Sequence, residues 1–205
     1  MMKRLVILAL LFAALTVRGG QTDDPIGVAV ENYFSTVFAK LSEVAAKNPT
    51  HDTFREAMKP VAESVDGFFD GTLIDTNFVI DQSYYKFHAL ANGFDLKKVK
   101  QLDYFRSLMS TSPAPQLSEP SHGSLFQPRL ISMRYPVITD GKLQSIVSMM
   151  VRTETFVEST GLAKCRAYKI ICCGELAEEN GDLSANPRKV KLTLPSTEWV
   201  IQYDP

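Results

Sequence analysis

The run from Ile131 to Val151, ISMRYPVITDGKLQSIVSMMV, limits the possible folds more than any other part of the sequence. Two apolar-rich segments of strand length flank the pair Asp140-Gly141. An aspartate followed by a glycine tolerates the positive φ angles of a two-residue hairpin turn. The sequence therefore predicts an antiparallel β-hairpin with its turn at Asp140-Gly141, within an antiparallel sheet.

A two-residue turn also predicts which residues of the hairpin lie opposite each other. The expected pairs are Tyr135 with Ile146, Met133 with Ser148, and Ile131 with Met150. These residues share one face of the hairpin, and the other face carries Ser132, Arg134, Val147, Met149 and Val151. Because both faces bear large apolar side chains, we expect a sheet that is covered on both sides.

The amino terminus has the pattern of a secretory signal peptide. The cationic pair Lys3-Arg4 precedes an apolar run from Leu5 to Leu15, and the small residues Val17 and Gly19 follow it. We expect cleavage after Gly19. The alternative, an uncleaved membrane anchor, requires about 20 apolar residues, which is longer than this run. The sequence thus predicts a signal peptide over 1–19 and a periplasmic or secreted protein.

Residues 20–205 have the length and composition of one globular domain. The chain is 45% hydrophobic and 22% charged, which is ordinary for a globular protein. Lys and Arg number 22 against 23 for Asp and Glu. With no basic excess to attract a phosphate backbone, we expect no nucleic acid partner.

The cysteines are odd in number: Cys165, Cys172 and Cys173. A strand that holds both Cys165 and Cys172 separates them by about 23 Å at ~3.3 Å per residue, which is too far for a disulfide. We therefore predict free thiols. There is no C-x-x-C motif, and the histidines are distant in sequence from the cysteines: His51, His88 and His122. We expect no metal and no cofactor.

Three helices are predicted in the first half of the chain. The first begins at Asp24-Pro25, where a capping carboxylate precedes a proline, and ends at Asn48-Pro49. A second restarts near Asp52 to Glu56 with Thr53 and Glu56 as a capping box, and Pro60 kinks or divides it. A third fits Leu96 to Met109, with Asp95 as its cap.

Strands and loops account for the remainder. The segments Asn77–Asp81 and Tyr84–Leu90 read as a pair of strands, after a break from Gly67 to Gly71. Ser110 to Pro128 is a long loop, either a functional loop or a disordered one. The later predictions are a short helix or turn over Thr153–Ser159 and strands within Lys164–Leu176, Val190–Leu194 and Glu198–Tyr203.

This order of elements indicates the fold class. The helices do not alternate with single strands, which favours an α+β domain with an antiparallel sheet over a parallel, doubly wound fold.

At this point the chain resembles the Cache family of extracytoplasmic sensor domains, which are PAS-like. The likeness covers roughly Pro25 to Phe156. It rests on the long leading helix and on three motifs: Asp103-Tyr104-Phe105, Arg134-Tyr135-Pro136-Val137 followed by Asp140-Gly141-Lys142-Leu143, and the strand from Ser145 to Val151. The resemblance implies a PAS/Cache-like antiparallel sheet packed against a long N-terminal helix.

The resemblance also implies a pocket between the sheet and the loop-bearing helix, for amino acids, carboxylates or other small metabolites. Tyr104 and Phe105 match the family's aromatic pair. The arginine that many members place just before this pair is replaced by Gln101 and Leu102, and the aspartate that holds an amino group falls on Met150. The usual charged clamp for an amino acid is therefore incomplete.

Combined with the predicted register, these matches give the candidate ligand-binding residues: Tyr104, Phe105, Met133, Tyr135, Ser148 and Met150. Because this set is apolar with a few hydroxyls, it suits a small uncharged or weakly polar molecule. An apolar face of this kind is also typical of hydrophobic core.

We therefore expect an exported, sensor-like binding domain without catalytic activity, which acts freely or through a separate membrane partner. Two alternatives remain. A protein-interaction accessory module would use Trp199 and Tyr203 on an exposed terminal edge strand. An isomerase-like enzyme would place His88 or Asp81 in a cavity, although motifs such as G-x-S-x-G and H-E-x-x-H are absent.

Overall fold

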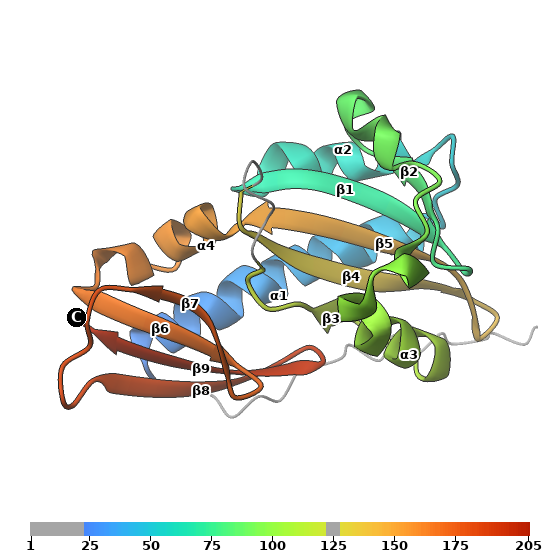
Figure 1. Cartoon of the computed structure of the whole chain (residues 1–205). Helices are drawn as coiled ribbons and strands as arrows, with labels where there is room; N and C mark the ends of the chain where they lie inside the picture. Colours follow the sequence, from blue (N-terminus) through green and yellow to red (C-terminus); the bar gives the residue numbers. More distant parts are fainter. Residues whose placement is uncertain (1–22, 122–127) are drawn as a thin grey trace, which may run out of the picture.

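Two antiparallel sheets share one long helix (Figure 1). The computed structural model describes residues 23–121 and 128–205. The predicted signal peptide and His122 lie outside the described residues. The helices are α1 (Pro25–Ala46), α2 (Phe54–Ser64), α3 (Asp103–Thr111) and α4 (Thr153–Ser159), with 3₁₀ turns η1 (Lys86–Ala91), η2 (Leu96–Lys98), η3 (Lys100–Leu102) and η4 (Leu162–Lys164).

The first sheet has five strands in the order β2-β1-β5-β4-β3, and the second has four in the order β7-β6-β9-β8. The strands of the first sheet are β1 (Phe68–Asp75), β2 (Ile80–Ser83), β3 (Gln116–Leu117), β4 (Leu130–Thr139) and β5 (Lys142–Arg152). Those of the second are β6 (Ala167–Cys172), β7 (Glu175–Asn180), β8 (Arg188–Leu194) and β9 (Thr197–Asp204). The predicted α+β class with antiparallel pairing is confirmed.

Helix α1 begins as predicted. The Asp24 carboxylate accepts hydrogen bonds from the backbone N–H groups of Ile26 and Gly27, both at 3.0 Å, and Pro25 occupies the first turn. Its apolar face packs on β4 and β5 of the first sheet and on β8 of the second. The helix therefore carries one continuous core across both sheets.

Aromatic side chains join α1 to the second sheet. The ring of Phe34 on α1 lies 5.2 Å from the Trp199 ring on β9 and 5.1 Å from the Phe156 ring on α4, measured between centroids. All three side chains are buried, and Trp199 is 0% exposed. Edge-to-face and stacked contacts of this kind add to the burial of apolar area.

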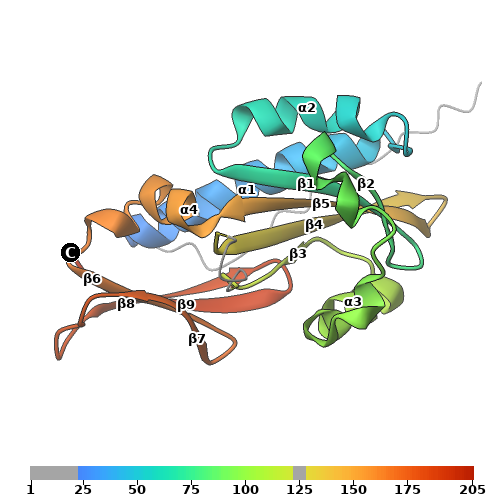
Figure 2. The same cartoon turned by 45° about the horizontal axis from the view of Figure 1, so that its top comes forward.

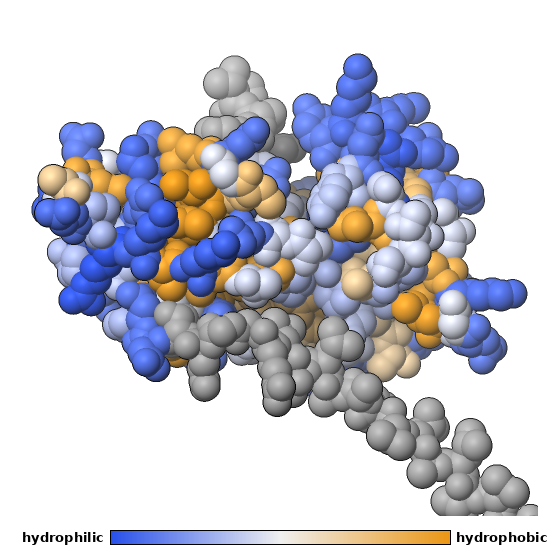
Figure 3. Space-filling model, turned by 90° about the horizontal axis from the view of Figure 1, so that it is seen from below, coloured by the Kyte–Doolittle hydropathy of each residue, from blue (hydrophilic) through white to orange (hydrophobic). Residues whose placement is uncertain are grey.

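The outer face of the second sheet is mostly charged. Ile171 and Val200 lie opposite each other on this face and are half-buried, whereas their neighbours Ile170 and Ile201 are buried toward α1. Seen from below, apolar surface forms a band among hydrophilic residues on this side of the molecule (Figure 3). The ion pairs Lys169–Glu179 and Lys191–Glu198 cross between neighbouring strands, at 2.9 and 2.7 Å.

The exposed terminal edge strand that the protein-interaction alternative requires is not formed. Strand β9 lies between β6 and β8 in the middle of the second sheet, and Trp199 and Tyr203 are buried. The Tyr203 hydroxyl donates to Asp24 at 2.7 Å, which ties the last strand to the start of α1. The reason is that β8 and β6 both pair with β9, so the last strand in sequence is not last in the sheet.

The segment from Gly67 to Leu90 was also predicted wrongly. The predicted break from Gly67 to Gly71 is instead the start of β1, which begins at Phe68, and most of the predicted strand Tyr84–Leu90 lies in η1. Gly71 explains part of this error, because a Cβ built there would lie 2.9 Å from Cγ of Met58 on α2. A glycine that weakens the strand pattern in the sequence is the residue that lets α2 approach β1.

Smaller differences concern the other helices. Thr53 makes no side-chain capping bond to α2; its Oγ1 accepts a hydrogen bond from the Thr50 N–H at 2.9 Å. Pro60 lies inside α2 without ending it. The predicted helix Leu96–Met109 begins as two 3₁₀ turns and becomes α-helical only at Asp103. The predicted helix Thr153–Ser159 forms with those bounds, as α4.

The hairpin turn forms as predicted, but the register beyond it does not. Asp140 and Gly141 have φ angles of +51° and +73°, and Thr139 pairs with Lys142. A bulge then leaves Gln144 on β5 without a partner. Beyond the bulge every pair shifts by one residue, so that Met133 faces Met149, Tyr135 faces Val147 and Arg134 faces Ser148. The predicted pairs of Met133 with Ser148, Tyr135 with Ile146 and Ile131 with Met150 are wrong.

Trp199→Ala is expected to lower the free energy of unfolding by about 3–5 kcal/mol, because it leaves a cavity between α1 and the second sheet. Denaturant unfolding followed by circular dichroism measures this. Phe87→Ala is the matched control, since Phe87 is 71% exposed and its loss should change stability by only about 0.5 kcal/mol. Equal effects of both variants would contradict the central place of Trp199 in the core.

Candidate functional site

A row of buried polar side chains crosses the whole first sheet, one from each strand. We call these residues the polar row: Ser83, Thr72, Ser148, Arg134 and Gln116, in the order β2-β1-β5-β4-β3. Directly paired residues of an antiparallel sheet point to the same face. None of the five is more than 9% exposed. Five buried polar groups at one level of a sheet are unusual, because sheet faces that pack in a core are normally apolar.

The polar row lies on the face of the first sheet that is opposite to α1. On that face Ile74 and Ile146 form a small hydrophobic cluster with Phe105 and Met109 of α3. The other face, with Met133 and Met149, packs in the main core beneath α1. Figure 2 shows the same arrangement, with α1 and α2 on one side of the sheet and α3 on the other.

Arg134 is the only charged member of the polar row. It is 9% exposed, and its Cζ lies 4.4 Å from the centroid of the Phe105 ring, in a cation–π contact. Across residues 23–121 and 128–205, no side chain forms an ion pair or a hydrogen bond with it. Arg134 is therefore a buried cation in direct contact with an aromatic ring, and the charge of Glu119 acts on it without forming an ion pair.

Burial makes the charge of Arg134 costly. It lowers the pKa of the guanidinium to about 10, and the negative charge of Glu119 opposes this effect. A pKa displaced this far corresponds to ~3 kcal/mol of free energy that favours the uncharged form. Since the side chain is charged at neutral pH, the folded protein bears this cost.

The other members of the row differ in how they are bonded. Ser83 Oγ donates to Asn92 Oδ1 at 3.0 Å, and Gln116 Nε2 donates to the backbone carbonyl of Phe105 at 3.4 Å. The hydroxyls of Ser148 and Thr72 bond to no other residue that the structure describes. The centre of the row, Thr72, Ser148 and Arg134, thus has hydrogen-bonding capacity that the described residues do not use.

The structure divides the sequence-predicted site residues between the two faces of the sheet. Ser148 and Met150 lie on the face of the polar row, and Phe105 contacts that row through Arg134. Met133 and Tyr135 lie on the opposite face, toward α1. Tyr104 is 66% exposed. The bulge at Gln144 is the physical reason for the division, because a shift of one residue moves each pair to the other face.

Sequence reasoning placed Arg134 on the wrong face and did not identify Thr72 and Gln116. Arg134 could have been recognised as a candidate site residue from the sequence, since an arginine in the middle of an apolar strand is rare unless it is paired. Thr72 could not have been recognised in this way, because β1 itself was not predicted.

The histidine and aspartate of the enzymatic alternative occupy ordinary polar contacts. His88 Nδ1 lies 2.7 Å from Oδ2 of the buried Asp70, and Asp81 lies 3.1 Å from His51. A cavity of about 370 Å³ lies between the two sheets, and neither His88 nor Asp81 lines it. The three cysteines form no disulfide; Cys172 is buried, and Cys173 lies exposed in a turn with a φ of +50°.

Two negative findings apply to the described part of the chain. Within 23–121 and 128–205, no group of three or more His, Cys, Asp or Glu residues is arranged to hold a metal ion. No helix in the same ranges combines the length and apolar character needed to cross a bilayer.

No family model matches the sequence, and no curated protein matches it. Solved structures do match. An extracellular ligand binding receptor from Desulfohalobium retbaense is similar with a TM-score of 0.66 and 11% identity; the match covers 87% of this chain and spans 39% of the receptor chain.

Two chemoreceptor domains match over most of both chains. The ligand-binding domain of the Pseudomonas aeruginosa amino acid chemoreceptor PctC, in complex with GABA, has a TM-score of 0.62 and 11% identity over 86% of this chain and 93% of its own. The ligand-binding domain of the Pseudomonas fluorescens chemoreceptor CtaA, with L-alanine, has a TM-score of 0.60 and 14% identity over 87% and 91%. The predicted PAS/Cache-like fold, a long N-terminal helix against antiparallel sheet, is thereby confirmed.

Arg134→Met is expected to raise the free energy of unfolding at neutral pH by about 1–3 kcal/mol, because it removes a buried unpaired charge and keeps the side-chain volume. Urea unfolding measures this. Lys189→Met, on the exposed face of β8, should change stability by about 0.5 kcal/mol or less.

The pH dependence of the same comparison has a definite sign. The folded-state pKa of Arg134 is about 10 and lies below that of the unfolded chain. Above this pH the unfolded state binds more protons than the folded state, so the stability of the native protein rises relative to Arg134→Met. If the difference in unfolding free energy between the native protein and Arg134→Met stays constant as the pH passes 10, the burial of the charge is contradicted.

Proposed function

We propose that this chain binds a small molecule that carries a carboxylate, on the face of the first sheet that bears the polar row. The observation that carries the proposal is Arg134, a buried cation without an anionic partner among the described residues. A ligand carboxylate would supply the missing partner and would recover the free energy that burial costs. Proteins keep such unfavourable groups chiefly where binding needs them.

The surroundings of Arg134 suit a carboxylate. A guanidinium is planar and can bind both oxygens of a carboxylate through two of its N–H donors, and contact with an aromatic ring does not consume these donors. Ser148, its direct neighbour on β5, and Thr72 beyond it offer two hydroxyls without partners among the described residues. These groups extend the contact toward β1.

Helix α3 is part of the same arrangement. Phe105 covers the Arg134 guanidinium, and Gln116 beside Arg134 holds the backbone of Phe105. A ligand that pairs with Arg134 therefore meets Phe105 as well. Binding and the position of α3 against the sheet are linked, which is a simple means of converting ligand binding into a structural change.

The chemoreceptor domains with the same fold support the carboxylate. Their complexes contain GABA and L-alanine, which both carry a carboxylate. This replaces the uncharged or weakly polar ligand expected from the sequence, because the observed register puts Arg134 on the ligand face. The amino group of an amino-acid ligand would lack its usual anionic partner, since Met150 stands where the resemblance expects an aspartate.

The protein would serve as a sensor-like binding domain without catalytic activity. We further propose that it is exported and works freely or with a separate membrane partner, in keeping with the signal-like sequence over 1–19 and with the extracellular receptor of the same fold.

A panel of monocarboxylates, dicarboxylates, GABA and α-amino acids is expected to contain a compound that raises the melting temperature, since binding to the native state alone stabilises it. Arg134→Met should abolish this rise, because it removes the ion pair. Differential scanning fluorimetry screens the panel, and calorimetry gives the dissociation constants.

Lys189→Met is the control and should bind as the unchanged protein does. Ser148→Ala should weaken binding by about tenfold, as expected for one lost hydrogen bond. The proposal fails if no carboxylate stabilises the protein, or if Arg134→Met binds as tightly as the unchanged chain.

A further inference from the structure

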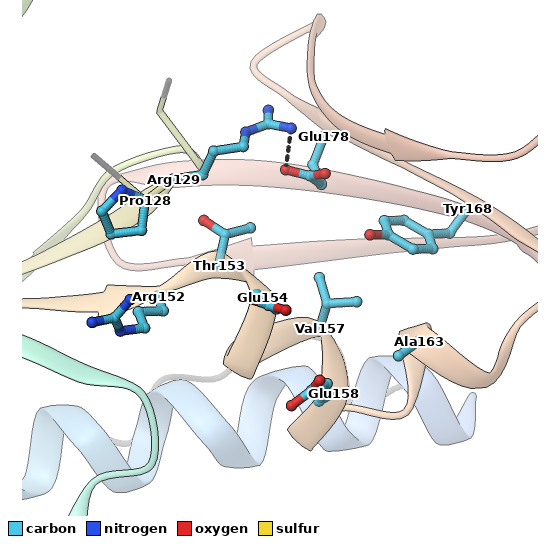
Figure 4. A pocket seen from close by; sticks show the side chains of 10 residues that line it. All are labelled: Pro128, Arg129, Arg152, Thr153, Glu154, Val157, Glu158, Ala163, Tyr168 and Glu178. Atoms are coloured by element: carbon cyan, nitrogen blue, oxygen red, sulfur yellow. Dashed lines mark ion pairs between the residues drawn. The ribbon is translucent and has the colours of Figure 1, made fainter. Parts of the chain in front are cut away.

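We infer a second binding site, separate from the polar row, in the cavity of about 370 Å³ between the two sheets, and we assign to it an uncharged, polyhydroxylated molecule of monosaccharide or polyol size. The cavity is bordered by the start of β4, by α4 and by strands β6 and β7 (Figure 4). Its volume lies in the range of about 300–1,000 Å³ that is typical of ligand pockets.

Two buried polar atoms of the lining have no hydrogen-bond partner in the described chain. Thr153 is 2% exposed, and its Oγ1 is unpaired; the Nε–H group of Arg129 is unpaired as well. Buried hydroxyls and N–H groups in folded proteins are almost always hydrogen-bonded. A fully buried hydroxyl at the wall of a cavity therefore points to an occupant that bonds to it.

The charges of the cavity wall indicate that this occupant is uncharged. Arg129 Nη1 and Glu178 Oε2 lie 2.6 Å apart, so that the cation and the anion of the inner wall neutralise each other. In Figure 4 this pair closes one side of the cavity. Arg152, at the rim, lies with its Cζ 5.4 Å from the Phe69 ring. A charged ligand would find no unneutralised opposite charge at the inner wall.

Apart from the exposed side chains of Arg152, Glu154 and Glu158, the polar groups that remain are those that recognise hydroxyls. Tyr168 directs its hydroxyl into the space that Thr153 borders (Figure 4). Burial raises the pKa of Tyr168, so the hydroxyl is protonated at neutral pH. The hydroxyls of Tyr168 and Thr153 can each donate and accept, and Arg129 Nε–H donates. Such a set matches sugar or polyol hydroxyls, which also do both.

The rest of the wall suits a carbon skeleton. Val157 of α4 projects into the same space as the hydroxyls, and Pro128 and Ala163 close its two ends (Figure 4). A few polar groups set in an apolar wall are the usual composition of a small-molecule site. A ligand there touches both sheets, since Tyr168 belongs to the second sheet and α4 follows directly from β5 of the first.

The experiment uses four probes, D-glucose, D-ribose, myo-inositol and glycerol, with saturation-transfer NMR for detection and calorimetry for affinity. At least one probe is expected to bind. Thr153→Val keeps the shape and removes the hydroxyl, and Tyr168→Phe does the same on the opposite wall. Each should weaken binding by about tenfold.

Thr193→Val and Tyr85→Phe are the matched controls, because neither residue lines the cavity, and both should leave binding unchanged. Arg134→Met should also bind the probe normally, which separates this site from the carboxylate site. Thr153→Val should melt at the same or a higher temperature than the unchanged protein, since it removes an unpaired buried hydroxyl. If that variant does not fold, Tyr168→Phe decides.

The inference is overturned if none of the four probes binds, or if a probe binds equally well to the unchanged protein and to the folded Thr153→Val and Tyr168→Phe variants. Failure of the carboxylate test leaves this result unaffected, because the two sites share no residue.

Discussion

The pairing of β4 with β5 is the interaction on which the rest of the first sheet depends. Both strands lie in the interior of the sheet, β1 pairs with β5 and β3 pairs with β4, so the register between them decides what every other strand presents to each face. One unpaired residue, Gln144, sets that register. It puts Met133 and Met149 into the core beneath α1 and leaves Arg134 and Ser148 on the opposite face.

Strand β5 also connects the two proposed binding sites. It carries Ser148 in the polar row near its middle, and directly after its last residue, Arg152, the chain reaches Thr153 in the wall of the cavity. Helix α4 then packs Phe156 against Phe34 of α1. Because α1 packs on both sheets, a change at either site acts on one shared core and not on an isolated module.

The comparison of sequence with structure shows where local chemistry is sufficient. The start of α1 could be predicted because Asp24 and Pro25 act on the backbone next to them. The turn at Asp140-Gly141 and the helix Thr153–Ser159 are local in the same sense. Strand β1 was missed because its glycine, Gly71, is explained only by the side chain of Met58, which packs against it from another helix. The bulge at Gln144 was missed because no turn chemistry marks it.

The amino-acid sequence by itself determined the leading helix, the hairpin turn and the antiparallel α+β class, since each follows from short-range propensity and hydrophobic spacing. Only the tertiary structure decided which side chains share a face, that Trp199 is core and not an exposed edge, and that a cavity lies between the sheets. The physical reason is that the face of a strand residue depends on its pairing partner. The observed pairing is shifted by one residue from the predicted one. Arg134 therefore lies on the same face as Ser148, at the centre of the candidate site.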